Sequence, residues 1–141
     1  KKEIAELEVM YYTKQIVNTL DYLHKNRVIH RDLKLGNLML NDLMDLKLGD
    51  FGLATKLDFY GEENEQVVDA EHIAPEVLEG KNGHSYEVDI WSLGVIIYTL
   101  IIGKPPFETA NVKTTYEKIR KNSYKFPEHV PISECGKDLI T

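Results

Sequence analysis

A short polar stretch running from His30 to Asn37 holds one aspartate, one lysine and one asparagine close together: Asp32, Lys34 and Asn37. Phosphoryl transfer needs such a set of groups. A carboxylate orients the attacking hydroxyl and takes its proton, a cation faces the transferred phosphate, and an amide oxygen helps to hold magnesium against the phosphate oxygens. The stretch therefore indicates phosphoryl-transfer chemistry, provided that a second carboxylate for the metal lies nearby.

A second motif supplies that carboxylate. Asp50-Phe51-Gly52 follows the alternating run Leu46-Lys47-Leu48, which is typical of a short strand. The two motifs occur in the order His-Arg-Asp-Leu-x-x-x-Asn and then Asp-Phe-Gly, the pattern that protein kinases use for their catalytic loop and their metal-binding aspartate. Each motif alone is short, but the ordered pair is strong support for a phosphotransferase.

The elements that position these motifs can be predicted from periodicity. Residues 3–24 are expected to form a helix, because apolar side chains recur on one face at steps of three or four: Val9, Tyr12, Ile16, Leu20 and Leu23. Val28-Ile29 is a short apolar entry to the first motif. Leu38–Leu40 and Leu46–Leu48 predict a small hairpin, with a polar turn that begins at Asn41.

The second half of the chain predicts further helices. Residues 53–73 lack a clear period and are expected to form a loop, as are residues 80–85, with a short helical turn at 77–78 between them. Residues 87–102 predict a long helix that is apolar nearly all round and therefore central. Val112, Tyr116 and Ile119 indicate an amphipathic helix, and Ser133 suits the cap of a last helix. The predicted fold class is mainly α with a small β-hairpin, and loops carry the polar chemistry.

Composition narrows the function classes. The 141 residues are 43% hydrophobic and 28% charged, which is an ordinary balance for one soluble domain. The net charge of −6 argues against nucleic acid as a partner. The longest apolar run, residues 93–102, is too short to span a bilayer, so we expect no membrane partner and no signal peptide. Cys135 is the single cysteine, which suits a reducing compartment.

The residues at this point resemble the C-terminal lobe of a eukaryotic protein kinase, and Lys34 two residues after Asp32 resembles the serine/threonine class. Three stretches are similar to the polo-like kinase family almost throughout: residues 22–38, 83–92 and 103–109. The resemblance covers nearly the whole chain. It implies that residues 1–141 are a partial kinase domain, from the helix before the catalytic loop to the start of a late helix. The family's α+β kinase fold would then lack its N-terminal lobe here.

The resemblance also implies a role for each motif residue. By position, Asp32 is expected to be the catalytic base and Lys34 to contact the transferred phosphate, while Asn37 and Asp50 hold magnesium. The implied cofactors are ATP and Mg²⁺, and the implied partners are protein substrates. Family resemblance also implies a cytoplasmic and nuclear location, at the centrosome and spindle.

Four further positions take roles from the resemblance. Met39 is expected to pack under the adenine ring, although the pattern alone is equally consistent with a plain core residue. The carbonyl of Gly36 is expected near the ribose. Asp89 is expected to anchor the catalytic loop from the central helix, and Glu76 to brace the end of the activation segment. His30 is expected to be a packed core histidine.

Two departures from the family leave alternatives open. The glycine-rich loop, the strand lysine and the helix glutamate of an N-terminal lobe are missing, so the fragment alone is expected to be inactive. The segment before Ala74 is altered, and Gln66 stands where the family carries its phosphorylated threonine. A pseudokinase or a degenerate kinase-fold scaffold is therefore the alternative to an active serine/threonine kinase. A small-molecule phosphotransferase is a weaker third reading.

Overall fold

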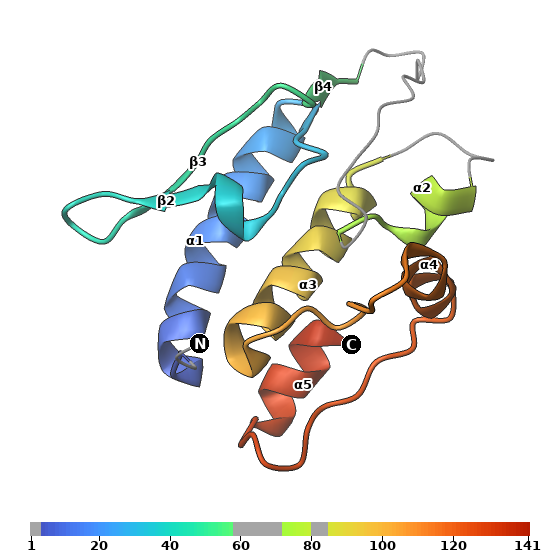
Figure 1. The fold of residues 1–141 in the computed structure, drawn as a ribbon. Coiled ribbons are helices and arrows are strands. Elements are labelled where there is room, and N and C mark those ends of the chain that lie inside the picture. Colours follow the sequence, from blue (N-terminus) through green and yellow to red (C-terminus); the bar gives the residue numbers. More distant parts are fainter. Residues whose placement is uncertain (1–3, 58–71, 80–84) are drawn as a thin grey trace.

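Helices dominate the computed structural model, which describes residues 4–57, 72–79 and 85–141 (Figure 1). Five α-helices lie in these residues: α1 (Glu6–Lys25), α2 (Pro75–Glu79), α3 (Glu87–Ile102), α4 (Val112–Arg120) and α5 (Glu134–Ile140). The strands are β1 (Val28–Ile29), β2 (Leu38–Leu40), β3 (Leu46–Leu48) and β4 (Thr55–Lys56), and a 3₁₀ turn, η1, spans Leu35–Asn37. The predicted class, mainly α with a small β-hairpin, is confirmed, and a second two-stranded sheet, β1 with β4, accompanies the hairpin.

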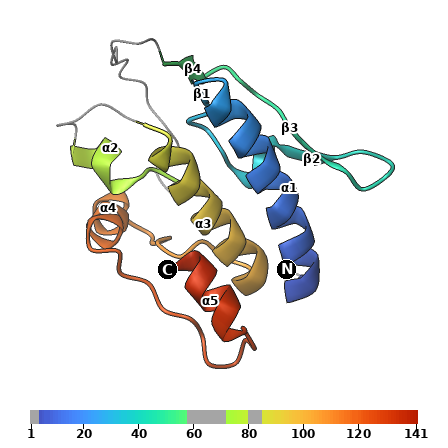
Figure 2. The same cartoon turned by 180° about the vertical axis from the view of Figure 1, so that it is seen from behind.

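The packed pair of α1 and α3 forms the centre of the molecule (Figure 2). All five residues of the predicted apolar face of α1 are buried. The helix begins at Glu6 rather than at the predicted residue 3, which lies outside the described part of the chain; Ala5 is its extended N-cap. Acidic side chains in the first turn and His24 and Lys25 in the last turn match the helix dipole.

Helix α3 has the predicted bounds and is buried on most of its circumference, as its nearly continuous apolar sequence requires. Gly103, with φ of 82°, ends the helix in the left-handed conformation that glycine adopts without steric cost. The amide of Gly103 donates to the carbonyl of Thr99. Helix α3 therefore presents a rigid, buried scaffold to the loops that pack on it.

The predicted hairpin is present, with β2 and β3 paired antiparallel so that Leu38 faces Leu48 and Leu40 faces Leu46. Asn41 organises its turn, since its side-chain oxygen accepts hydrogen bonds from the amides of Leu43 and Asp45. The hairpin lies along α1 in Figures 1 and 2. It is fastened there by Gln15 of α1, whose Oε1 accepts a hydrogen bond from the Leu46 amide at 2.8 Å.

The prediction of a loop over residues 53–73 is wrong at its start, because Thr55 and Lys56 form β4, which pairs antiparallel with β1. A two-residue strand has too short a sequence pattern to be recognised without its partner. The rest of that prediction falls on residues 58–71, and the loop predicted over residues 80–85 falls mainly on residues 80–84. Both ranges, which include Gln66, lie outside the described residues.

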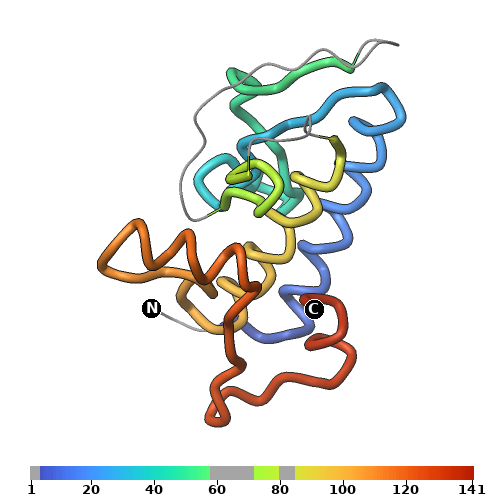
Figure 3. The backbone as a smooth tube through the Cα atoms, turned by 90° about the vertical axis from the view of Figure 1, so that its right-hand side faces the viewer, coloured from blue at the N-terminus to red at the C-terminus, as the bar shows by residue number. Residues whose placement is uncertain are grey.

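The predicted amphipathic helix is present as α4, although Val112, a member of its predicted apolar face, is 58% exposed. The predicted cap of the last helix is confirmed. Thr115 and Ile119 of α4 are buried, and Ser133 caps α5 by accepting a hydrogen bond from the amide of Gly136 at 2.9 Å. Figure 3 shows α4 on the opposite side of α3 from α1. No helix in the described residues combines the length and the apolar character needed to cross a membrane.

Candidate active site

Two short ladders bring the sequence motifs together. Strand β1 leads into the His30–Asn37 stretch and pairs with β4, which follows Asp50-Phe51-Gly52. At the other end of the stretch, β2 pairs with β3, and the amide of Gly49 donates to the carbonyl of Asn37 at 2.9 Å. The two motifs are therefore held side by side at both ends, although Asp32 and Asp50 lie far apart in the chain.

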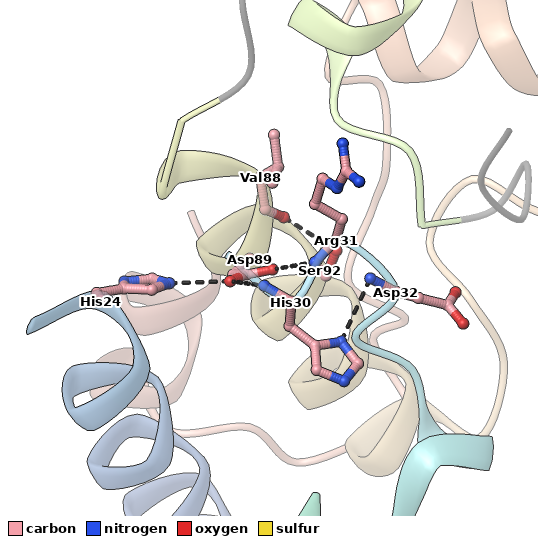
Figure 4. A network of polar contacts seen from close by, with 7 residues as sticks. All are labelled: His24, His30, Arg31, Asp32, Val88, Asp89 and Ser92. Carbon is pink, nitrogen blue, oxygen red and sulfur yellow. Dashed lines mark hydrogen bonds and ion pairs between the residues drawn. The ribbon is translucent and has the colours of Figure 1, made fainter. Parts of the chain in front are cut away.

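The buried carboxylate of Asp89, in α3, holds the start of the first motif (Figure 4). Its Oδ2 accepts a hydrogen bond from the amide of His30 at 3.0 Å, and its Oδ1 accepts one from the amide of Arg31 at 2.9 Å. The ring of His24, at the end of α1, lies with Nε2 2.9 Å from Oδ2. A carboxylate with 0% exposure needs such donors, and here they fix the backbone just before Asp32.

Arg31 adopts a left-handed backbone conformation, with φ of 64°. A long side chain rarely adopts this conformation unless its surroundings impose it. Here Asp89 holds the Arg31 amide, while the Nε of Arg31 donates to the carbonyl of Leu53 at 2.6 Å. Desolvation lowers the pKa of the Arg31 guanidinium, and the charge of Asp89 opposes that shift. Arg31 thus ties the first motif to the segment after Gly52.

His30 is buried and structural, as predicted. Its Nε2 lies 3.0 Å from the carbonyl oxygen of Gly49, and its Nδ1 lies 3.3 Å from the amide nitrogen of Asp32. A carbonyl only accepts and an amide only donates, so these partners assign the proton to Nε2 and leave Nδ1 as the acceptor. The ring also packs edge-on against Phe51. His30 therefore positions both aspartates' loops and has no free nitrogen for proton transfer.

Asp32, Lys34 and Asn37 form one cluster. The Nζ of Lys34 lies 3.1 Å from Oδ2 of Asp32. The side-chain amide of Asn37 donates to the same oxygen at 3.0 Å and to the Asp32 carbonyl at 2.8 Å. Oδ1 of Asp32 accepts no hydrogen bond from a described residue. Figure 4 shows this carboxylate directed away from the Asp89 network. One carboxylate oxygen is therefore oriented by two donors, and the other accepts no hydrogen bond from the described residues.

Asp50 presents an exposed carboxylate from a left-handed residue with φ of 56°. Its Oδ1 accepts a hydrogen bond from the amide of Gly52 at 3.2 Å, which forms a tight local turn. Oδ2 has no partner among the described residues. The amide of Asn37 points its nitrogen at Asp32 and keeps its oxygen for another ligand. Asn37 and Asp50 thus each retain one oxygen that suits a hard cation.

The described residues contain no group of three or more histidine, cysteine, aspartate or glutamate side chains that could enclose a metal ion. An amide oxygen and one carboxylate make an incomplete shell. Magnesium commonly binds in this way, with one or two protein ligands while water and phosphate oxygens fill the remaining positions. The donor set therefore fits a metal ion that arrives with a phosphorylated ligand.

Met39 and Gly36, the two residues that were expected to line the nucleotide site, differ in their surroundings. Met39, on β2, is 55% exposed, so the reading of Met39 as plain core is wrong. Its Cε lies over Gly49, where a Cβ would approach to 2.6 Å. A Cβ on Gly36 would meet nothing within 4 Å. The hairpin therefore offers an apolar surface next to Asn37, as a platform for a flat ring would require.

Sequence reasoning missed two residues of this site. His24 received no role, yet it is the third partner of Asp89; its position in the last turn of α1, beside the buried Leu23, was the only available signal. Gln15, which holds β3, gave no signal at all. Glu76 lies in α2 and forms no ion pair within the described part of the chain, so its predicted bracing role remains a prediction.

Comparison with known proteins agrees with this geometry. The family model described as the protein kinase domain matches residues 1–141. The chain is 60% identical over 141 residues to a probable serine/threonine-protein kinase, CCRP1, of Zea mays, covering 99% of this chain and 22% of that protein. It is 58% identical over 131 residues to serine/threonine-protein kinase PLK1 of Xenopus laevis (92% and 22%), and 53% identical over 131 residues to serine/threonine-protein kinase polo of Drosophila melanogaster (92% and 23%). The chain spans about a fifth of the length of these relatives.

Proposed function

This chain belongs to the protein kinase domain family, with polo-like serine/threonine kinases among its relatives, and on that premise we propose that it contributes the catalytic loop of an enzyme that phosphorylates proteins. The reaction moves the γ-phosphoryl group of ATP to a serine or threonine hydroxyl. Residues 1–141 would form most of the C-terminal lobe of the kinase domain, with β2 and η1 at the edge that faces the nucleotide.

The arrangement of Asp32 supports this proposal most directly. Lys34 and Asn37 hold Oδ2, so Oδ1 is the oxygen that would accept the hydrogen bond of a substrate hydroxyl and then its proton. The Asp89 contacts to His30 and Arg31 keep the loop from turning. A fixed carboxylate with one oxygen available is the geometry that positioning a nucleophile requires.

The neighbouring residues would supply the electrostatics. Lys34, next to the hydroxyl site, would stabilise negative charge on the transferred group, and Asn37 and Asp50 would hold the metal ion. When bound, ATP with Mg²⁺ supplies the phosphoryl group and the positive charge that neutralises the leaving phosphates. Met39 would lie under the adenine ring and Gly36 near the ribose.

The test incubates the purified full-length protein with Mg²⁺, radiolabelled ATP and an acceptor protein, and identifies the amino acid that becomes labelled. We expect phosphoserine or phosphothreonine, and at least a hundredfold lower turnover in the Asp32→Asn variant, since general-base catalysis typically contributes 10²–10⁴-fold. Asp50→Asn should instead raise the Mg²⁺ concentration that the enzyme needs for its half-maximal rate.

Asp42→Asn is the matched control, because Asp42 is an exposed turn residue of the hairpin and lies outside the site. It should keep the wild-type rate. Saturable nucleotide binding by a wild-type protein that never transfers phosphate would overturn the proposal and favour a kinase-fold scaffold. A rate that survives Asp32→Asn would overturn the assignment of Asp32.

A further inference from the structure

A basic surface lies on α4 and the turn after it, away from the candidate active site. It consists of five cations, here called the α4 strip: Lys113, Lys118, Arg120, Lys121 and Lys125. Four of them are exposed and Lys118 is partly so. Glu117 is the only carboxylate within residues 112–125. The candidate site makes no use of these residues.

The cations of the α4 strip are not paired with acidic side chains of the described residues. None of its cations forms an ion pair with a carboxylate of the described residues, even though lysines elsewhere do, such as Lys25 with Asp21 and Lys137 with Glu134. The chain as a whole carries a net charge of −6. Overall composition does not explain a cluster of positive charges on an acidic protein. The cations of such a cluster repel one another, most strongly at low ionic strength.

Helix geometry places three of these charges, those of Lys113, Arg120 and Lys121, on one face of α4. Thr115 and Ile119 turn toward the core, where Ile119 packs with Val95 and Phe107. Arg120 and Lys121 follow Lys113 by seven and eight residues, about two helical turns, and therefore lie on the face opposite Thr115 and Ile119. The N-cap Asn111 and the buried Thr115 hold the helix in place. Nine helical residues span about 13 Å, the length of roughly four residues of extended peptide.

We propose that the α4 strip binds an acidic segment of a partner polypeptide. Such a segment is short enough to lie within about one Debye length of the strip, so it meets mainly the five cations and little of the surrounding negative charge. A membrane or a nucleic acid extends its negative charge over a far larger area, and the net charge of −6 would repel it. The strip also lacks what a membrane requires, because Val112 is the only large apolar side chain that is exposed within residues 112–125.

The experiment measures fluorescence anisotropy of a labelled peptide of about ten residues, alternating glutamate and serine, titrated with the 141-residue chain without nucleotide. Because no ATP is present, the result is independent of the proposed kinase activity. We expect saturable binding that weakens strongly as the salt concentration rises from about 50 to 300 mM. The Arg120→Glu and Lys121→Glu double variant should bind roughly tenfold more weakly.

Lys14→Glu with Lys47→Glu is the matched control, because these exposed lysines lie on α1 and β3 and change the net charge by the same amount. It should retain most of the binding. Glu117→Gln removes the only carboxylate of the segment and should tighten binding, an effect that no unfolded variant would produce.

Three outcomes would overturn the proposal. Equal weakening in the α4 and control variants would show that only net charge matters. Unchanged affinity in Glu117→Gln would place the peptide elsewhere. Tighter binding to phosphatidylserine vesicles, or to a single-stranded oligonucleotide, than to the acidic peptide would assign the strip to a different class of partner.

Discussion

The Nε2 atom of His24 in α1 lies 2.9 Å from Oδ2 of Asp89 in α3, although the two residues are 65 positions apart in the sequence. The same Asp89 carboxylate accepts the backbone amides of His30 and Arg31. Three segments of the chain therefore converge on one buried group, directly before the candidate base. This convergence makes the stability of the fold and the geometry of the site depend on the same contacts.

Replacing Asp89 should be costly. Asp89→Ala leaves the buried amide of His30 and the partly buried amide of Arg31 without acceptors. Each unsatisfied group costs about 1–3 kcal/mol, so we expect a loss of about 3 kcal/mol in the free energy of unfolding. Urea denaturation followed by circular dichroism measures this change. Asp21→Ala, at an exposed ion pair with Lys25, is the control and should change stability by less than about 1 kcal/mol. A similar midpoint for both variants would contradict the anchoring role of Asp89.

The contribution of His24 should operate through Asp89. His24→Ala should lower the free energy of unfolding by about 1–2 kcal/mol in the wild-type background. In the Asp89→Ala background the same change should cost much less, because its partner has gone. A double-mutant cycle measures the coupling. Additive losses would mean that His24 stabilises the fold through its ring contact with Tyr86 instead.

The contact between α1 and α5 should respond to acid. Glu6 accepts hydrogen bonds from the side chain and the amide of Ser133, and these bonds lower the pKa of Glu6 below its ordinary value of 4.5. A group with a depressed folded pKa stabilises the fold above its unfolded pKa, and that contribution disappears as pH falls through the folded value.

The Glu6→Gln variant tests this acid response. Its deficit in the free energy of unfolding should be largest near pH 6, constant up to neutral pH, and smaller near about pH 3. Chemical denaturation at several pH values measures the deficit. Glu8→Gln, two residues further along the same helix and exposed, should show no such trend. A deficit that grows on acidification would reverse the assigned sign.

Gly49 and Gly36 form a matched pair for the nucleotide platform. In Gly49→Ala the new methyl group would approach Met39 Cε to 2.6 Å, so the methionine side chain must move. In Gly36→Ala nothing lies within 4 Å of the new group. The chain has three methionines, so methyl resonances of ¹³C-labelled methionine are readily assigned. The Met39 resonance should shift in Gly49→Ala only; a comparable shift in both variants would refute this packing.

The hairpin should make the isolated chain bind hydrophobic dye. Met39, Leu40, Leu43 and Met44 are between 48% and 80% exposed, whereas Leu38, although part of the same strand, packs partly against the main core. Contiguous exposed apolar side chains usually mark a surface that a partner covers. Leu40→Lys with Leu43→Lys should lower dye fluorescence and self-association, measured by light scattering. Dye binding that is unaffected would place the apolar surface elsewhere.

Much of this protein followed from sequence because the determining interactions are local. Helical periodicity predicted the buried face of α1, and a nearly continuous apolar run predicted α3. Asn41 and Ser133 predicted a turn and a cap through side-chain bonds to nearby amides. The motif from His30 to Asn37 placed Asp32, Lys34 and Asn37 together in one short loop, and the structure shows them in contact. The net charge of −6 also follows from residue types alone.

Tertiary structure decided what depends on distant partners. Strand β4 exists because β1 offers its backbone groups, and two residues carry no period of their own. Met39 proved exposed rather than core because it pairs with the exposed Lys47 across the hairpin and only its Cε lies over Gly49, which sequence alone does not show. His24 became part of the site only when α1 packed against α3. A buried carboxylate requires donors, but which residues supply them is decided by packing, since the requirement is met in space and not along the chain.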